Sequence, residues 1–321
     1  MKQVASPVGE ELRPHPELAV CVGGLELPNP LIAASGTFGF GQEMRAFYDP
    51  SCLGAVVSKG FTLQPKEGNP APRIAEASMG LLNSVGLQNP GLDAVLEEEL
   101  PRARSQGLRL IANVAGAVAE DYVELCRRLD REEGFLAIEL NLSCPNVRAG
   151  CLSFGLDPEA VCGITKACKA VTTKPIWVKL TPNVQDIRLT ARAAQEGGAD
   201  AVSLVNTFLG LAVDLGRRRP VLRNNYGGYS GPGIKPIALR MVHEVATCLE
   251  IPVIGLGGIE TADDVLEFIV AGASAVQVGS ANLRRPRAML EILEDLPRRM
   301  QHWGIDSLLE LRGSLEVWPR D

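Results

Sequence analysis

The chain has 321 residues and a formal net charge of −6, with 46% hydrophobic and 22% charged residues. These proportions are ordinary for a soluble enzyme, and the acidic balance argues against a nucleic-acid-binding surface, which would need a basic stripe. No apolar run is long enough to span a bilayer and the N-terminus lacks the apolar core of a signal peptide, so we expect a cytoplasmic protein.

The first part of the chain predicts a tail followed by a β-hairpin. Residues 1–17 contain three prolines, several charges and little periodicity, which is typical of a flexible N-terminal tail. Residues 19–27 have the pattern of two short strands that turn at Gly23-Gly24. No linker divides the rest of the chain, so we predict a single domain over residues 18–321.

Short apolar runs and helical patterns alternate from residue 31 onward. The candidate strands are residues 31–35, 55–59, 108–113, 136–142, 175–180, 201–206, 252–256 and 275–279. The candidate helices are residues 91–104, 119–131, 157–171, 183–196, 236–249, 261–271 and 286–300. Two of these helices begin at capping residues, Asp157 before a proline and Thr261 three residues before an aspartate.

This alternation predicts βαβ units and a parallel sheet. Because the eight candidate strands are apolar on both faces, closure into a (β/α)8 barrel, the TIM barrel, is favoured over an open doubly wound sheet, which is the alternative. The active site of such a barrel lies among the loops at the carboxyl ends of the strands, which we expect to be long. The residues at or just beyond the strand ends are Ser35, Lys59, Asn113, Asn141 with Cys144, Lys179, Asn206 with Thr207, Gly257-Gly258 and Gly279-Ser280.

Neutral amides and two lysines dominate these strand ends. An asparagine side chain offers both donors and an acceptor, which suits the edges of an imide or pyrimidine ring. Each lysine could instead mark a strand exit into solvent, and each asparagine a turn or a cap, although three asparagines at three strand ends weaken that explanation for the set. No strand end carries clustered Asp, Glu or His, and the histidines are His15, His243 and His302, so we predict no metal site.

Glycines follow the last two candidate strands, in Ile254-Gly-Leu-Gly-Gly258 and Val278-Gly-Ser280. Glycines at these two places of a TIM barrel expose backbone N–H groups that commonly bind phosphate. The third glycine of a dinucleotide-binding Gly-x-Gly-x-x-Gly motif is absent, so the pattern indicates a mononucleotide, with FMN as the leading candidate. A simple tight turn is the alternative explanation of either pair.

Cys144 differs from the other seven cysteines. No two cysteines have the Cys-x-x-Cys spacing of a zinc or iron–sulfur site, and most fit reduced core residues. Cys144 follows a strand, precedes a proline and lies among amides, which points to a chemical role, with a packing residue as the alternative. A nucleophile would need an activating histidine, and none lies near a strand end, so proton transfer fits better.

Nine short segments, in order over about residues 20–285, form one recurring pattern. They are Ala34-Ser-Gly-Thr-Phe-Gly39, Ser58-Lys-Gly60, residues 67–74, residues 83–91, Ala112-Asn-Val-Ala-Gly116, Asn141-Leu-Ser-Cys-Pro-Asn-Val147, Val178-Lys-Leu-Thr-Pro182, residues 230–236 and Gly255-Leu-Gly-Gly-Ile259. In these segments the chain resembles the class 1 dihydroorotate dehydrogenases. The resemblance implies a TIM barrel that oxidises (S)-dihydroorotate to orotate in pyrimidine biosynthesis.

Details of these segments favour class 1B. Gly86-Leu-Gln-Asn89 is more similar to class 1B than to the fumarate-using class 1A, and cysteine instead of serine at 144 differs from the quinone-linked class 2. The chain departs from the family pattern at Ser280, where threonine is usual, at Cys151, where glycine is usual, and at Phe61, where threonine is usual. These departures bear on loop motion, not on the chemistry.

The resemblance implies roles for individual residues. Cys144 would take the C5 proton of dihydroorotate as the C6 hydride passes to FMN, and Lys179 would stabilise the reduced flavin. The substrate would be held by Lys59, Asn83, Ser84, Val85, Gly86, Leu87, Asn141, Asn146, Asn206 and Thr207. FMN would be held by Ser35, Lys59, Gly60, Asn113, Asn141, Lys179, Val205, Gly231, Gly257, Gly258, Gly279 and Ser280.

The resemblance also implies a partner. Class 1B enzymes pass electrons to a second subunit that carries FAD and a [2Fe–2S] cluster and reduces NAD. Because this chain lacks the cysteine spacing for a cluster, we expect a homodimer that joins two such subunits as a heterotetramer. The alternatives are a fumarate-dependent class 1A enzyme, a flavin-dependent tRNA dihydrouridine synthase, which the acidic charge disfavours, and a non-catalytic binding barrel.

Overall fold

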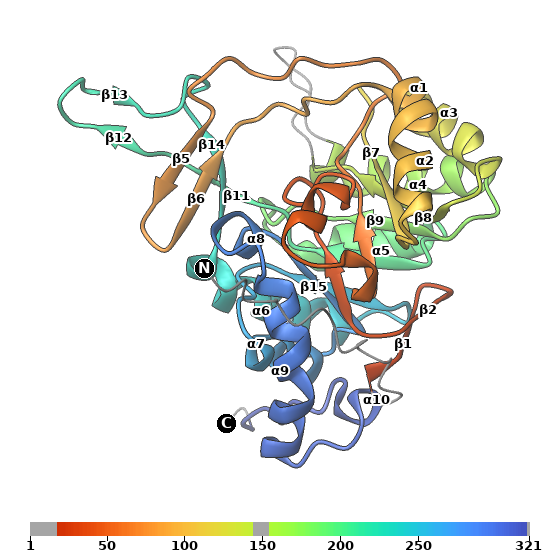
Figure 1. Ribbon diagram of the computed structural model, residues 1–321, viewed down its shortest axis with the longest axis vertical. Coiled ribbons are helices and arrows are strands. Elements are labelled where there is room, and N and C mark those ends of the chain that lie inside the picture. Colours follow the sequence, from red (N-terminus) through yellow and green to blue (C-terminus); the bar gives the residue numbers. More distant parts are fainter. Residues whose placement is uncertain (1–17, 144–153, 320–321) are drawn as a thin grey trace, which may run out of the picture.

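The computed structural model describes residues 18–143 and 154–319, and its centre is a closed barrel of eight parallel strands (Figure 1). Neighbouring strands follow the order of the chain, and the last pairs with the first. Each strand overlaps its predicted range, so the predicted (β/α)8 barrel is confirmed. The barrel strands are β3 (Leu31–Ala33), β4 (Ala55–Val57), β7 (Leu110–Val114), β8 (Phe135–Asn141), β9 (Ile176–Lys179), β10 (Ala201–Leu204), β15 (Val253–Leu256) and β16 (Ala275–Val278).

Side chains of each barrel strand alternate between the surrounding helices and the barrel interior. In β8, Ile138 and Leu140 belong to the large hydrophobic cluster that packs against the helices, whereas Ala137 belongs to a smaller cluster inside the barrel. The two-residue period of a strand therefore places Glu139 and Asn141 on the interior face, above Ala137. The interior is apolar at its lower end and becomes polar toward the carboxyl ends of the strands.

The predicted hairpin closes the lower end of the barrel. Strands β1 (Val20–Val22) and β2 (Leu25–Leu27) pair in antiparallel fashion and turn at Gly23-Gly24, as predicted. Val22 and Leu27 pack into the interior cluster. A Cβ atom on Gly23 would lie 2.4 Å from Nε1 of the buried Trp177, so this turn requires glycine for packing as well as for its φ of +52°.

Helices lie between most of the barrel strands, where the sequence predicted them. The helices that match predicted ranges are α1 (Leu92–Ala94) continued by the π-helical η4 (Val95–Glu99) and α2 (Leu100–Ser105), then α3 (Ala119–Asp130), α4 (Pro158–Lys169), α5 (Ile187–Glu196), α6 (Lys235–Ala246), α7 (Ala262–Val270) and α9 (Ala288–Trp303). Both predicted caps form: Asp157 accepts a hydrogen bond from the N–H of Glu159, and Thr261 forms a capping box with Asp264. None of the helices in the described ranges is both long and apolar enough to cross a membrane.

The long loops at the carboxyl ends of the strands contain a sheet that the sequence did not predict. Strands β5 (Ile74–Ala77), β6 (Gly80–Asn83), β11 (Phe208–Gly210) and β14 (Gly227–Ser230) form this antiparallel sheet, and β12 (Val213–Asp214) and β13 (Arg219–Pro220) form a small hairpin. The sheet and the hairpin project from one side of the barrel, at the upper left of Figure 1. These strands are two to four residues long, and glycine or proline lowers the β-propensity of β6, β11, β13 and β14, so the sequence gives only a weak strand signal here.

Some predictions concern residues outside the described ranges. The tail at residues 1–17 and the residues Cys144, Asn146 and Cys151 are among them. The single domain over residues 18–321 stays a prediction.

Candidate active site

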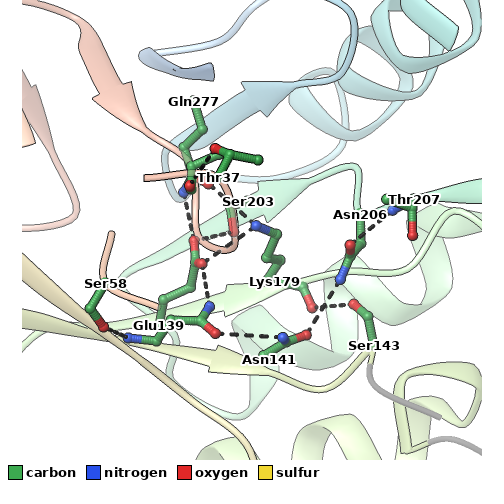
Figure 2. Close-up of polar contacts among 12 residues, drawn as sticks. Thr37, Ser58, Glu139, Asn141, Ser143, Lys179, Ser203, Asn206, Thr207 and Gln277 are labelled. Carbon is green, nitrogen blue, oxygen red and sulfur yellow. Dashed lines mark hydrogen bonds and ion pairs between the residues drawn. The ribbon is translucent and has the colours of Figure 1, made fainter. Parts of the chain in front are cut away.

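A cluster of buried polar side chains fills the barrel just below the carboxyl ends of its strands (Figure 2). At its centre is Glu139, which has no exposed side-chain surface. Its carboxylate accepts hydrogen bonds at 2.7 Å from Asn113 Nδ2, 2.8 Å from Ser203 Oγ and 2.6 Å from Gln277 Nε2. A buried carboxylate is tolerated only when donors replace its lost hydration, and these three supply that replacement from three other strands.

Lys179 provides the positive charge of the cluster. Its Nζ lies 3.7 Å from Oε1 of Glu139 and 3.5 Å from Oε1 of Gln277. Because only 5% of the Lys179 side chain is exposed, the alternative that this lysine marks a strand exit into solvent is wrong. The other predicted lysine, Lys59, is half-buried beyond β4, and its backbone N–H donates to the carbonyl of Gly39 at 2.8 Å.

The predicted asparagines form a hydrogen-bonded chain that runs from Glu139 toward the mouth of the barrel (Figure 2). Nδ2 of Asn141 donates to Oδ1 of Asn113 at 3.5 Å, and Nδ2 of Asn206 donates to Oδ1 of Asn141 at 3.4 Å. Oδ1 of Asn206 accepts the backbone N–H of Thr207 at 2.9 Å. The structure therefore joins residues that the sequence placed separately at the ends of three strands.

The predicted substrate segment 83–87 begins at the last residue of β6 and approaches the hydrogen-bonded asparagines through the antiparallel sheet. Asn83 Nδ2 donates to the carbonyl of Gly228 at 3.3 Å, and a Cβ on Gly228 would lie 2.1 Å from Oγ1 of Thr207. The buried hydroxyl oxygen of Ser84 has no hydrogen-bond partner among the described residues, which is unusual for a buried polar atom. Leu87 lies against Gly60, because a Cβ on that glycine would be 3.4 Å from Leu87 Cδ2.

Four of the five predicted cofactor glycines, all except Gly60, are of two kinds. Gly231, Gly257 and Gly258 have positive φ angles of +118°, +129° and +79°, and an added Cβ at each would lie within 2.8 Å of protein atoms. Backbone conformation and packing alone therefore require glycine at these three positions. Gly279 differs, because a Cβ there would lie 3.6 Å from its nearest neighbour, Ala34 Cβ, in ordinary contact.

The absence of a side chain at Gly279 thus leaves space at a strand end, as a closely approaching phosphate would require. Ser280 follows directly and precedes the short helix α8 (Ala281–Arg284). Ser35 is half-buried just beyond β3, next to Ala34, whose N–H donates to the carbonyl of Val278. Val205 is buried after β10, with its Cγ2 3.4 Å from the position of a Cβ on Gly257.

Two predicted residues, Cys144 and Asn146, lie outside the described residues, but the residue before them is well fixed. Ser143 Oγ donates to the backbone carbonyl of Lys179 at 3.0 Å. The hydroxyl of Tyr122 donates to the carbonyl of Asn141 at 3.0 Å. The end of β8 is therefore held by β9 on one side and by α3 on the other.

Sequence reasoning missed three polar residues of the cluster: Glu139, Ser203 and Gln277. Each lies within a barrel strand, one layer deeper than the strand ends that we considered. One signal in the sequence could have pointed to this cluster: Glu139 lies inside an otherwise apolar strand, and a glutamate is rarely fully buried there without partners.

Comparison with known proteins identifies the family. The sequence model described as "Dihydroorotate dehydrogenase" matches residues 17–300, which include all of the strands and predicted site residues described above. The chain belongs to the dihydroorotate dehydrogenase family. Members of this family depend on a flavin. The polar cluster and the glycines lie at the carboxyl ends of the strands, the end at which TIM barrels carry their active sites.

Curated relatives within the dihydroorotate dehydrogenase family are similar over almost their whole length. Proteins from Listeria innocua and Alkaliphilus metalliredigens are 50% and 51% identical to this chain over 298 residues, which are 93% of the chain and 98% of each relative. A protein from Enterococcus faecalis is 50% identical over 295 residues. All three are named "Dihydroorotate dehydrogenase B (NAD(+)), catalytic subunit".

Proposed function

We propose that this protein is the catalytic subunit of a class 1B dihydroorotate dehydrogenase, a cytoplasmic enzyme that oxidises (S)-dihydroorotate to orotate in de novo pyrimidine biosynthesis. The observation that carries the proposal is the full-length similarity to relatives named for this activity. The chain of asparagines and the two lysines at the barrel mouth support it, since amides and ammonium groups match the pyrimidine edges and the carboxylate of the substrate.

The substrate is held by side chains that the barrel and the antiparallel sheet present to the mouth. Lys59 pairs with an anionic group, and the amides of Asn83, Asn141 and Asn206 bind the ring edges. Ser84, Val85, Gly86, Leu87, Asn146 and Thr207 complete the proposed set. The half-buried position of most of the described members is consistent with contact to a small ligand.

Cys144 is the proposed general base. Oxidation removes a proton from C5 and a hydride from C6 and leaves a carbon–carbon double bond in orotate. The thiolate of Cys144 takes the C5 proton, and the resulting thiol later returns it to solvent. The residue immediately before it, Ser143, is hydrogen-bonded to the backbone of Lys179, another residue of the proposed site.

FMN is the proposed cofactor, and the donor set of the barrel fits it. FMN, when bound, would be the oxidant that accepts the C6 hydride. The positive charge of Lys179 would stabilise its reduced form, and Asn113 and Asn141 would help to hold it. The open space at Gly279 supports a phosphate site there, which Ser35, Gly60, Val205, Gly231, Gly257, Gly258 and Ser280 complete.

The electrons are proposed to pass from this chain to a partner subunit. The names of the relatives, which combine NAD(+) with a catalytic subunit, support a partner that carries FAD and a [2Fe–2S] cluster and reduces NAD. We propose a homodimer of this chain joined to two such partners as a heterotetramer.

Steady-state assays test the assignment. The purified chain together with its electron-transfer partner should oxidise dihydroorotate with NAD, whereas the chain alone should not reduce NAD. Strong activity of the isolated chain with fumarate would instead identify a class 1A enzyme. A preparation that lacks flavin absorbance and does not bind orotate would contradict the whole proposal.

Alanine substitutions at two glycines test the phosphate site. Gly279→Ala should leave the thermal midpoint of the apoprotein nearly unchanged, because the new methyl group is in ordinary contact, yet it should weaken FMN binding at least tenfold. Gly258→Ala is the matched control and should lower the midpoint itself, since its φ is +79° and its Cβ would meet Lys235 at 2.8 Å. Unchanged FMN affinity of Gly279→Ala would place the phosphate elsewhere.

A further inference from the structure

Four side chains from four different barrel strands contact the carboxylate of Glu139, and each of them does so through a donor group. Its Oε1 accepts from Asn113 on β7 and lies 3.7 Å from the ammonium group of Lys179 on β9. Its Oε2 accepts from Ser203 on β10 and Gln277 on β16. An ionised carboxylate can only accept hydrogen bonds, so both of its oxygens match the donors that surround them.

The direction of the asparagine chain follows from this carboxylate. Asn113 must turn its NH₂ group toward Glu139, so its carbonyl oxygen faces Asn141. Asn141 then presents its NH₂ group to Asn113 and its carbonyl oxygen to Asn206. Each amide thereby has a fixed donor side and a fixed acceptor side. A ligand that binds beside these amides therefore encounters only one arrangement of donors and acceptors.

Glu139 also governs the position of Lys179. Gln277 turns its NH₂ group toward the carboxylate, which leaves its carbonyl oxygen to face Lys179 Nζ at 3.5 Å. The ammonium group of Lys179 therefore lies near one oxygen of Glu139 and one oxygen of Gln277. The charge of Lys179 is partly balanced by the buried carboxylate.

We propose that Glu139 is a positioning residue of the active site: its carboxylate sets the donor–acceptor direction of the Asn113–Asn141–Asn206 chain and balances the charge of Lys179. This inference rests on the proposed function, because it concerns the binding of FMN and orotate. It assigns no contact between Glu139 and either ligand.

Glutamine at position 139 has the same shape but cannot accept hydrogen bonds at both ends. One end of its amide becomes a donor, so either Gln277 or Asn113 must reverse its own amide. Reversal of Gln277 turns its NH₂ group toward Lys179, and reversal of Asn113 reverses the asparagine chain. In both arrangements the charge of Lys179 loses its counter-charge.

The test compares Glu139→Gln with Ser203→Ala, which removes one donor to the same carboxylate but keeps its charge. Two quantities are measured on FMN-loaded protein: the midpoint potential of the flavin and the dissociation constant of orotate. Glu139→Gln should raise the ratio of reduced to oxidised flavin at a fixed potential at least tenfold, which is about 30 mV for a two-electron couple, and weaken orotate binding at least tenfold. Ser203→Ala should change each quantity less than threefold.

The double variant Glu139→Gln/Lys179→Met removes both charges and provides the second measurement if the single variant does not fold, since a neutral pair avoids an unpaired buried charge. Its midpoint potential should lie near that of the wild type and above that of Lys179→Met, because both charges are gone. Equal effects of Glu139→Gln and Ser203→Ala, or a midpoint potential of the double variant equal to that of Lys179→Met, would overturn the inference. Failure of the wild-type protein to bind FMN or orotate would refute the proposed function instead.

Discussion

Replacing Cys144 with alanine is expected to slow the reduction of bound FMN by dihydroorotate about 10²- to 10⁴-fold near neutral pH, the usual contribution of a positioned general base. Alanine removes the group that takes the C5 proton but none of the residues proposed to hold FMN. The flavin content of the purified variant should therefore equal that of the wild type. Rapid mixing with dihydroorotate under anaerobic conditions, followed by flavin absorbance, measures the effect directly.

Serine at position 144 provides the control for this experiment. A hydroxyl is a weaker acid than a thiol, so Cys144→Ser should be slow at neutral pH and regain rate as the pH rises, whereas Cys144→Ala should not. A Cys144→Ala variant that reduces its flavin as fast as the wild type would show that another group takes the proton.

The barrel and its rim were predictable because both depend on local patterns. Each barrel strand is a short run that is apolar on both faces, and the fold places every strand end at one mouth. Asn113, Asn141, Lys179 and Asn206 could therefore be assigned to one site from their positions in the chain alone.

The interior layer could not be predicted in the same way. Glu139 meets Ser203 and Gln277 across 64 and 138 residues of sequence, and these contacts exist only once the barrel closes. The antiparallel sheet is a similar case, because β6 pairs with β14, which lies far along the chain. Only the tertiary fold brings such partners together, so local propensity carries no signal for them.

Replacing Lys179 with methionine is expected to lower the free energy of unfolding by about 3–5 kcal/mol, because the substitution leaves the carboxylate of Glu139 buried without its counter-charge. The same variant should reduce its flavin more slowly than the wild type and at a lower midpoint potential, since the positive charge that favours reduction is gone. Orotate affinity should change less than the reduction rate, because Asn141 and Asn206 remain. Urea denaturation, rapid-mixing absorbance and orotate titration measure the three quantities.

Lys169 offers a matched comparison at the surface of the same protein. Its Nζ lies 2.5 Å from Asp200, but the two side chains are 36% and 32% exposed, so solvent screens the pair and Lys169→Met should cost less than about 1 kcal/mol. The contrast between the two lysines isolates the effect of burial, because both variants remove an ammonium group from a carboxylate. If Lys179→Met were no less stable than Lys169→Met, the buried pair would not contribute as its geometry indicates. A loss of orotate affinity larger than the loss of reduction rate would mean that Lys179 acts mainly by positioning the substrate.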